Sequence, residues 1–196
     1  MMKPKNGILK IKQFLIPGRV QGEIKTPVIP LNEIDPHSFL LSASEMTSLK
    51  ALYQELLADP DFGFRYGFQK PPENREIFLA SQGRKNPTII GMVCRFKITE
   101  ERDGQDRRIS ILSDWIVGRN FRREGVARRL LECIVATSQA ETRAEKSRAL
   151  KLPKLPRETF CVYLPAGLYA ANTCLVNLGF EYAPGPDSFL FECPCE

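Results

Sequence analysis

Hydrophobic residues recur with helical spacing after Ser42. Apolar side chains three and four positions apart fall on one face of a helix, and here they continue until Asp59-Pro60 interrupts the pattern. The segment opens with Ser42-Ala43-Ser44-Glu45, which has the spacing of a capping box. The apolar stripe consists of Met46, Leu49, Leu52, Tyr53, Leu56 and Leu57. This pattern predicts an amphipathic helix between Ser42 and Asp59.

Shorter apolar runs bounded by glycine, proline or charged residues predict strands. Residues 77–81 and 88–98 read as two strands joined by the glycine-containing segment 82–87, which indicates a hairpin. A charged turn is expected over 100–108, followed by a strand over 109–117. Further strands are expected over 160–164, 180–182 and 189–192.

Two more helices are predicted in the second half. After Gly125, apolar residues keep one helical face from Val126 to Thr137, while Arg128, Arg129 and Glu132 face away. Residues 166–178 form the other helix, which Gly179 closes. Between them, residues 141–158 carry many charges and two prolines. We interpret this stretch as a solvated helix end and loop, with a basic surface for an acidic partner as the alternative.

Residues 1–36 are expected to form an N-terminal arm, with strands near 8–14 and 27–31, and residues 37–196 to form one domain. Aromatic side chains alternate with small or polar ones over 62–68. They fit either an apolar strand or loop packed on the core, or an aromatic wall of a substrate pocket.

Composition places the chain among ordinary globular proteins, with 43% hydrophobic and 26% charged residues. The 28 basic and 23 acidic residues give a net charge of +5, which suits an anionic ligand but is too mild to indicate nucleic acid. No apolar run is long enough to span a membrane and the N-terminus lacks the apolar core of a signal peptide, so we expect a cytoplasmic protein. We expect it to be a monomer or a homodimer. Free thiols are expected for the six scattered cysteines, and a single histidine supports no metal site.

Candidate chemistry lies in the run from Arg122 to Ala127, between the predicted strand 109–117 and a helix. The run contains a basic residue, Arg122, then Gly125 and then the small residue Ala127. This spacing lets the first turn of the helix approach a ligand closely. Its free N–H groups and the positive end of the helix dipole favour an anion such as phosphate.

These segments resemble the GNAT superfamily of acyl-CoA-dependent N-acetyltransferases. The resemblance rests on residues 113–117, the R-x-x-G-x-A run at 122–127, and the helix 171–178 followed by Gly179-Phe180, and it covers residues 42–192. It implies an α+β (α/β) fold with a central mixed, mostly antiparallel sheet flanked by helices, whose splayed central strands form the acyl-CoA cleft. It also implies a coenzyme site formed by Ile116, Val117, Arg122, Arg123, Gly125, Val126, Ala127 and Arg128.

In that resemblance, backbone groups of Ile116 and Val117 pair with the pantetheine arm, and amides around Gly125 hold the diphosphate. Arginines 119, 122, 123, 128 and 129 add a positive rim that suits the 3′-phosphate. Asp114, the only carboxylate in the central strand, is the candidate base, with a solvated or satisfied strand carboxylate as the alternative. The Val117 N–H would polarise the acyl carbonyl.

The expected activity is acetyl transfer from acetyl-CoA to an amine of a small molecule or peptide, by direct attack in a ternary complex. The chain departs from the family pattern at Leu175, where many relatives have a tyrosine acid, and at Leu168, where an asparagine is usual. Two alternatives remain open: a non-catalytic acyl-CoA sensor on the same fold, and a basic nucleic-acid-binding module that uses residues 143–157, the last in rank.

Overall fold

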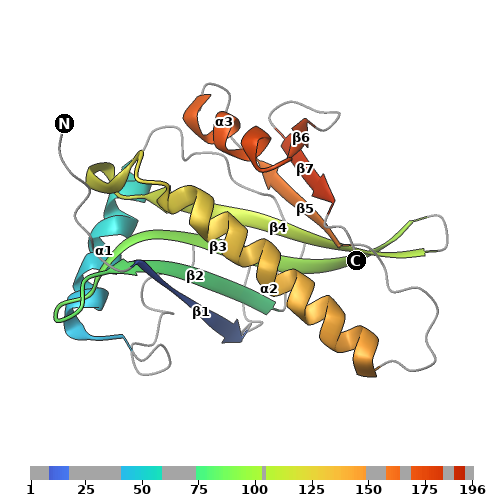
Figure 1. Cartoon of the computed structure of the whole chain (residues 1–196), viewed down its shortest axis with the longest axis horizontal. Helices are drawn as coiled ribbons and strands as arrows, with labels where there is room; N and C mark the ends of the chain where they lie inside the picture. The colour runs from blue at the N-terminus through green and yellow to red at the C-terminus, as the bar shows by residue number, and fades with distance from the viewer. Residues whose placement is uncertain are drawn as a thin grey trace.

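One mixed sheet of seven strands, in the order β1-β2-β3-β4-β5-β7-β6, forms the centre of the molecule (Figure 1). The computed structural model describes residues 9–17, 41–58, 74–102, 105–148, 158–163, 169–182 and 188–192. The strands are β1 (Leu9–Pro17), β2 (Asn74–Gln82), β3 (Thr88–Arg102), β4 (Gln105–Val117), β5 (Glu158–Tyr163), β6 (Glu181–Tyr182) and β7 (Ser188–Glu192). The helices are α1 (Ala43–Leu57), the 3-10 helix η2 (Arg119–Phe121), α2 (Val126–Arg148) and α3 (Tyr169–Asn177).

Neighbouring strands run antiparallel except β4 and β5, which are parallel. A parallel pair needs a crossover connection, and α2 lies in the segment between the two strands. The predicted mixed, mostly antiparallel sheet with flanking helices is therefore confirmed. The strand expected near 8–14 is β1, which forms an edge of this same sheet. The strand expected over 27–31 and the aromatic run 62–68 lie outside the described residues.

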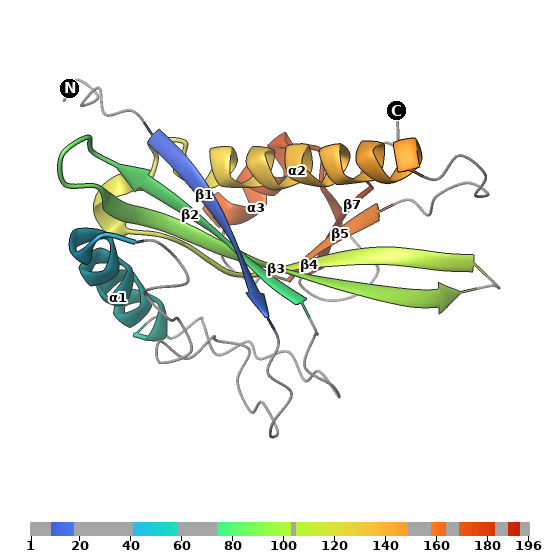
Figure 2. The same cartoon turned by 90° about the horizontal axis from the view of Figure 1, so that it is seen from below.

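Helices cover both faces of the sheet. Figure 2 shows α1 on one face and α2 with α3 on the other. Along β2, Phe78 and Ala80 join the buried cluster beneath α2, whereas Ile77 and Leu79 join the cluster beneath α1. Side chains alternate between the faces of a strand, so a strand buried on both sides is apolar at consecutive positions.

The capping box predicted for α1 is present. The Glu45 N–H donates to Ser42 Oγ at 3.3 Å, and the Ser42 N–H donates to Glu45 Oε2 at 3.0 Å. Lys12 of β1 donates to Glu45 Oε1 at 2.6 Å, which ties the edge strand to the first turn of α1. Glu45 itself is buried.

We expect Glu45→Gln to lower the free energy of unfolding by about 1 kcal/mol at pH 7, because the capping contact survives but the charge that pairs with Lys12 and the helix dipole is lost. Burial raises the pKa of Glu45, but hydrogen bonds from Lys12 and Ser42 outweigh it and hold the pKa below its ordinary value of 4.5. A lowered folded-state pKa contributes stability above the ordinary value, and that contribution is lost as pH falls.

Urea unfolding at pH 7 and at pH 3 checks this, with Glu132→Gln on the exposed face of α2 as the control. The difference between wild type and Glu45→Gln should shrink at pH 3, which is below the ordinary pKa of 4.5, because the stability contributed by the lowered pKa is lost as pH falls. An equal difference at both pH values would contradict the proposed charge contribution.

Two sequence-based boundaries were wrong. The expected charged turn over 100–108 is mostly strand, because β3 and β4 stay paired as far as Arg102 opposite Gln105. Backbone pairing needs no apolar side chains, so the charged end of a hairpin gives no periodic hydrophobic signal in the sequence. Figure 2 shows the end of the β3–β4 hairpin extending past β5. The helical stripe ends near Thr137, but α2 continues to Arg148. Residues 141–148 form the end of α2, as the helix end expected there requires, and residues 149–157 lie outside the described residues.

Gly179 closes α3 as predicted. The Phe180 N–H donates to the Leu175 carbonyl at 3.0 Å and the Gly179 N–H to the Val176 carbonyl at 2.9 Å, which is a Schellman motif. Gly179 takes a φ of 88°, a left-handed conformation that glycine adopts without strain. Leu175 and Phe180 then pack in the same buried cluster, which fixes α3 against the sheet.

Candidate functional site

The centre of the site is an irregularity in β4. Cys94 of β3 pairs with Ser113 and Met92 pairs with Ile116, so both Asp114 and Trp115 lie opposite the single residue between Met92 and Cys94. This two-against-one arrangement is a β-bulge, which bends the strand. Asp114 has a φ of 49°, in the left-handed region where aspartate and asparagine are enriched among non-glycine residues.

Beyond this bulge, β4 is no longer paired with β5. The parallel ladder joins Arg108–Leu112 to Glu158–Val162 and ends at Leu112 opposite Val162. Within the described part of the chain, no strand pairs with the β5 side of residues 113–117. An unpaired strand edge presents N–H and C=O groups that can bind an extended ligand as an added strand.

Hydrogen bonds show which backbone groups face this open edge. The Gly118 N–H donates to the Ile90 carbonyl at 3.0 Å and therefore points toward β3. Backbone groups of successive strand residues point to alternate sides, so those of Ile116 also face β3 and those of Trp115 and Val117 face the open edge. Arg122 Nε donates to the Val117 carbonyl at 3.1 Å, which agrees with this direction.

A turn with free N–H groups follows β4 and η2. Arg123 and Gly125 have positive φ values of 68° and 77°, and the first hydrogen bond of α2 runs from the Arg129 N–H to the Gly125 carbonyl at 3.1 Å. The N–H groups of Val126, Ala127 and Arg128 consequently have no acceptor within the helix. Left-handed residues beside a helix start form a concave set of N–H groups that binds anions.

Gly125 leaves this turn open. A Cβ atom built at Gly125 would meet no other atom within 4 Å, so the side of the turn that it faces is unobstructed. Gly91 of β3 serves a different purpose, because a Cβ there would lie 3.0 Å from Val126 Cγ1. Gly91 therefore lets the first turn of α2 pack closely on the sheet beside the open edge of β4. Together these features fit a diphosphate that continues into a strand-like arm.

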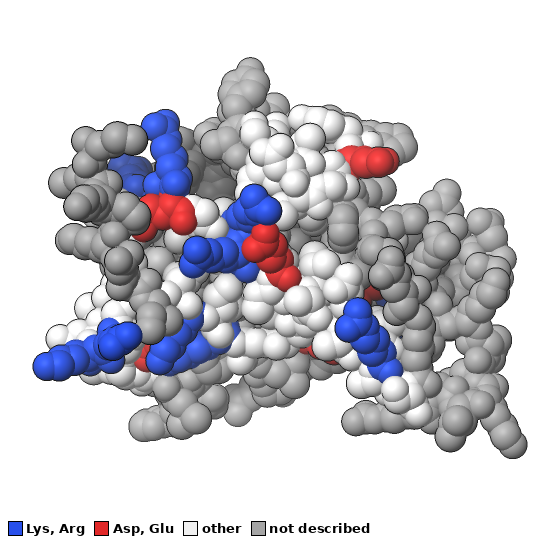
Figure 3. Space-filling model, in the orientation of Figure 1, with Lys and Arg blue, Asp and Glu red and all other residues white. Residues whose placement is uncertain are grey.

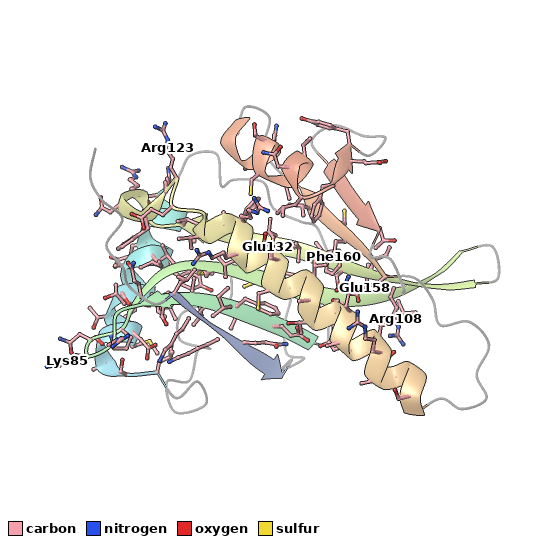
Figure 4. All side chains as sticks on the ribbon, viewed as in Figure 1. Lys85, Arg108, Arg123, Glu132, Glu158 and Phe160 are labelled. Carbon is pink, nitrogen blue, oxygen red and sulfur yellow. The ribbon has the colours of Figure 1, made fainter. Side chains whose placement is uncertain are left out.

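Basic side chains gather over the start of α2 (Figure 3). Arg119 and Arg122 pair with Glu55 of α1, and Arg128 pairs with Glu132 at 2.7 Å. For Arg123 and Arg129, no acidic partner is found in the described ranges. Arg123 projects outward from the turn before α2 (Figure 4). Because Arg119 and Arg122 share the single carboxylate of Glu55, the rim keeps a net positive charge, to which Arg123 and Arg129 contribute most.

Polar groups on β4 lie inside the protein at the point where the strands part. Asp114 and Ser113 are only 4% and 6% exposed. Among the described residues, Ser113 Oγ and Trp115 Nε1 are buried and have no hydrogen-bond partner. Buried polar atoms normally have a partner, so such atoms are typical of a site that a ligand or water completes.

The helix α3 offers little acid chemistry. Leu175 is fully buried in the core, and an aliphatic side chain holds no proton to donate. Burial raises the pKa of the half-buried Cys174 thiol, although the Arg128 charge acts in the opposite direction. Cys174 is therefore a thiol rather than a thiolate near neutral pH. The side chains of Tyr163 and Tyr169 lie outside the described residues.

All eight predicted coenzyme-binding residues and Asp114 lie in the continuous stretch 114–128, which forms the open edge and the turn. The structure adds Glu55 and Trp115 to the predicted residues. Glu55 gave no signal in the sequence, because it is an ordinary polar position on a helix. Asp114 did give a signal for the bulge, since aspartate is depleted in regular strands.

Comparison with known proteins defines the class. The model of the Acetyltransferase (GNAT) family matches residues 43–152, more than half of the chain, and includes the open edge and the turn. The protein belongs to this family of acetyltransferases. A search of curated proteins found no match.

Several solved structures match this chain at low sequence identity. A mutant of the AtaT toxin, bound to the C-terminus of the antitoxin AtaR and to acetyl-CoA, is 13% identical with a TM-score of 0.48, and the match covers 61% of this chain and 68% of that one. The KacTA–DNA complex is 12% identical with a TM-score of 0.47, covering 94% of each chain. NAA60 of Arabidopsis thaliana, in complex with a bisubstrate analogue, is 12% identical with a TM-score of 0.47, covering 78% and 95%.

In the described part of the chain, no helix is both long enough and apolar enough to cross a membrane.

Proposed function

We propose that this protein transfers an acetyl group from acetyl-CoA to an amine by direct attack in a ternary complex. The observation that carries the proposal is the continuity of the site. The open edge at Trp115 and Val117 leads through a short turn to the free N–H groups of Val126, Ala127 and Arg128. That sequence of groups matches an extended amide-containing arm that ends in a diphosphate.

The coenzyme would be held by backbone groups more than by side chains. The backbone groups of Val117 would pair with the pantetheine arm. Those of Ile116 face β3 and would hold this part of β4 in the sheet. The amides of Val126, Ala127 and Arg128 and the open turn at Gly125 would hold the diphosphate. Arg123 and Arg129, which lack acidic partners among the described residues, would supply charge for the 3′-phosphate.

Acetyl transfer requires a neutral amine, a polarised carbonyl and a leaving thiolate. An alkylamine with a pKa of about 10.4 is mostly protonated near neutrality, so a base must accept its proton. We assign this role to Asp114, directly or through water, because it is the carboxylate at the point where β4 leaves β5. The N–H groups of Val117 and Trp115 face the open edge and would stabilise the oxyanion.

The bond changes balance without a further reactant. The amine nitrogen forms a bond to the carbonyl carbon, the carbon–sulfur bond breaks, and the amine proton passes to Asp114 or water. A thiol with a pKa of about 8.5 leaves as a thiolate that water can protonate, so a dedicated acid is not essential. The buried Leu175 is compatible with this route.

A second candidate function is a non-catalytic acyl-CoA sensor, which the buried Leu175 favours because no acid group stands at that position. It shares the coenzyme site and differs only in turnover. Release of free thiol from acetyl-CoA in the presence of amines, peptides or aminoglycosides distinguishes the two, since any acceptor-dependent turnover excludes a pure sensor.

The proposed cofactor site predicts that coenzyme A stabilises the protein. A ligand present at about 100 times its Kd adds about 2.7 kcal/mol, which corresponds to a rise in Tm of about 5–10 °C for a chain of this size. Thermal unfolding with and without millimolar coenzyme A measures it, with adenosine as a control that lacks the diphosphate and the arm. A folded protein that shows no shift would contradict the proposal.

We place the enzyme in the cytoplasm. The support is that Cys94, Cys133, Cys161 and Cys174 are all free thiols, as proteins in reducing compartments usually have.

A further inference from the structure

A carboxylate from α1 reaches the turn that follows β4. Glu55 Oε1 accepts the Arg119 N–H at 3.0 Å and lies 3.5 Å from Arg119 Nε and 3.4 Å from an Arg122 terminal nitrogen. This oxygen atom therefore accepts two hydrogen bonds and forms ion pairs with both arginines. Since α1 covers the sheet face opposite α2, Glu55 connects the turn on the coenzyme side to the helix on the other face (Figure 2).

Three of the polar groups of Arg122 bond to other protein atoms. Its Nε donates to the Val117 carbonyl, its terminal nitrogen faces Glu55, and its backbone N–H donates to the Arg119 carbonyl at 3.4 Å. The peptide group between Val117 and Gly118 is thus held on both sides, by Arg122 at its oxygen and by Ile90 at its N–H.

We propose that Arg122 and Glu55 are positioning residues for the open edge of β4, and that the Arg122 side chain is not a phosphate ligand. This inference rests on the proposed function. A carbonyl oxygen has two lone pairs, so Val117 can accept from Arg122 and from a ligand amide together. Fixing this carbonyl also fixes the Val117 N–H, which points to the same side of the strand.

The contacts of Glu55 with Arg119 and Arg122 fix the positions of backbone groups and add little to the stability of the fold. The side chains of Arg119 and Arg122 are 73% and 51% exposed, and ion pairs with such exposure contribute little to folding. We therefore expect variants of Arg122 and Glu55 to fold normally. Their effects should appear in coenzyme binding and in the hydrogen exchange of nearby backbone amides.

Two substitutions separate hydrogen bonding from charge. In Arg122→Gln, Nε2 is attached to Cδ as Nε is in arginine, so the donor to Val117 remains and the charge is lost. In Arg122→Lys the charge remains, but a methylene replaces Nε and the donor is lost. We expect the Kd for coenzyme A to rise less than about 3-fold in Arg122→Gln and about 10-fold in Arg122→Lys, a factor typical of one lost hydrogen bond.

Calorimetric titration of coenzyme A at two salt concentrations tests this order, with Glu132→Gln as a control that removes an exposed partner of Arg128. Weaker binding by Arg122→Gln than by Arg122→Lys, with reduced salt dependence, would make Arg122 a phosphate ligand and overturn the inference. In steady-state assays, Arg122→Lys should raise the KM for acetyl-CoA and also lower kcat, because the Val117 N–H that Arg122 holds in place would stabilise the oxyanion.

Hydrogen exchange keeps this inference separate from the proposed function. If wild type binds no coenzyme A, the proposed function fails, but exchange at residues 117–122 still tests positioning in the free protein. We expect faster exchange of the Arg119 amide in Glu55→Ala, and wild-type protection in Glu55→Gln because its amide oxygen still accepts. Equal exchange in wild type and Glu55→Ala would refute the positioning role.

Discussion

Replacing Gly125 by glutamate should abolish the stabilisation by coenzyme A. Gly125 has a φ of 77° and its missing Cβ faces open space at the anion-binding turn. A carboxylate there would occupy the diphosphate path and repel it. We expect the rise of about 5–10 °C in Tm that is predicted for wild type at about 100 times Kd to be absent in this variant. Thermal unfolding with millimolar coenzyme A measures the loss.

Two control variants isolate the cause. Gly125→Ala carries the same backbone strain, roughly 1–2 kcal/mol for an L-residue in the left-handed region, but no charge, and should retain a reduced shift. Ala136→Glu adds the same charge at an exposed position of α2 and should retain the full shift. If Gly125→Glu, folded at the temperature of the assay, still gained several degrees from coenzyme A, the diphosphate would have to bind elsewhere.

Local chemistry explains what the sequence predicted well. The α1 helix begins at a capping box whose two hydrogen bonds involve Ser42 and Glu45, three residues apart, and α3 ends at Gly179 through contacts within six residues. Such signals lie within one window of sequence, so they can be read without knowing the fold. The turn at 122–127 belongs to the same class, because a helix start and its free N–H groups are local properties.

Contacts between distant segments explain what the sequence did not predict. The bulge at Asp114 exists only relative to β3, and the open edge exists only because β5 stops pairing at Val162. Glu55 bonds to Arg119 across 64 residues, and nothing in a polar helix position indicates that partner. The assignment of Val117 rather than Ile116 to the edge likewise required the hydrogen bond from Gly118 to Ile90.

Replacing Asp114 by asparagine should leave coenzyme binding intact and remove most of the turnover. Asparagine has the same size and tolerates the left-handed region, so the bulge at a φ of 49° is preserved and Tm should change little. A positioned general base contributes about 10²–10⁴-fold to the rate, and we expect kcat to fall by a factor in this range.

Thiol release with a responsive amine measures kcat, and calorimetric titration measures the Kd for coenzyme A. Glu124→Gln is the control, because it removes an exposed carboxylate near the same turn without touching β4. Unchanged kcat in Asp114→Asn would assign the base to another group. A fall in coenzyme affinity equal to the fall in rate would show instead that Asp114 maintains the bulge, because a base that acts only on the amine leaves the binding of the free coenzyme unaltered.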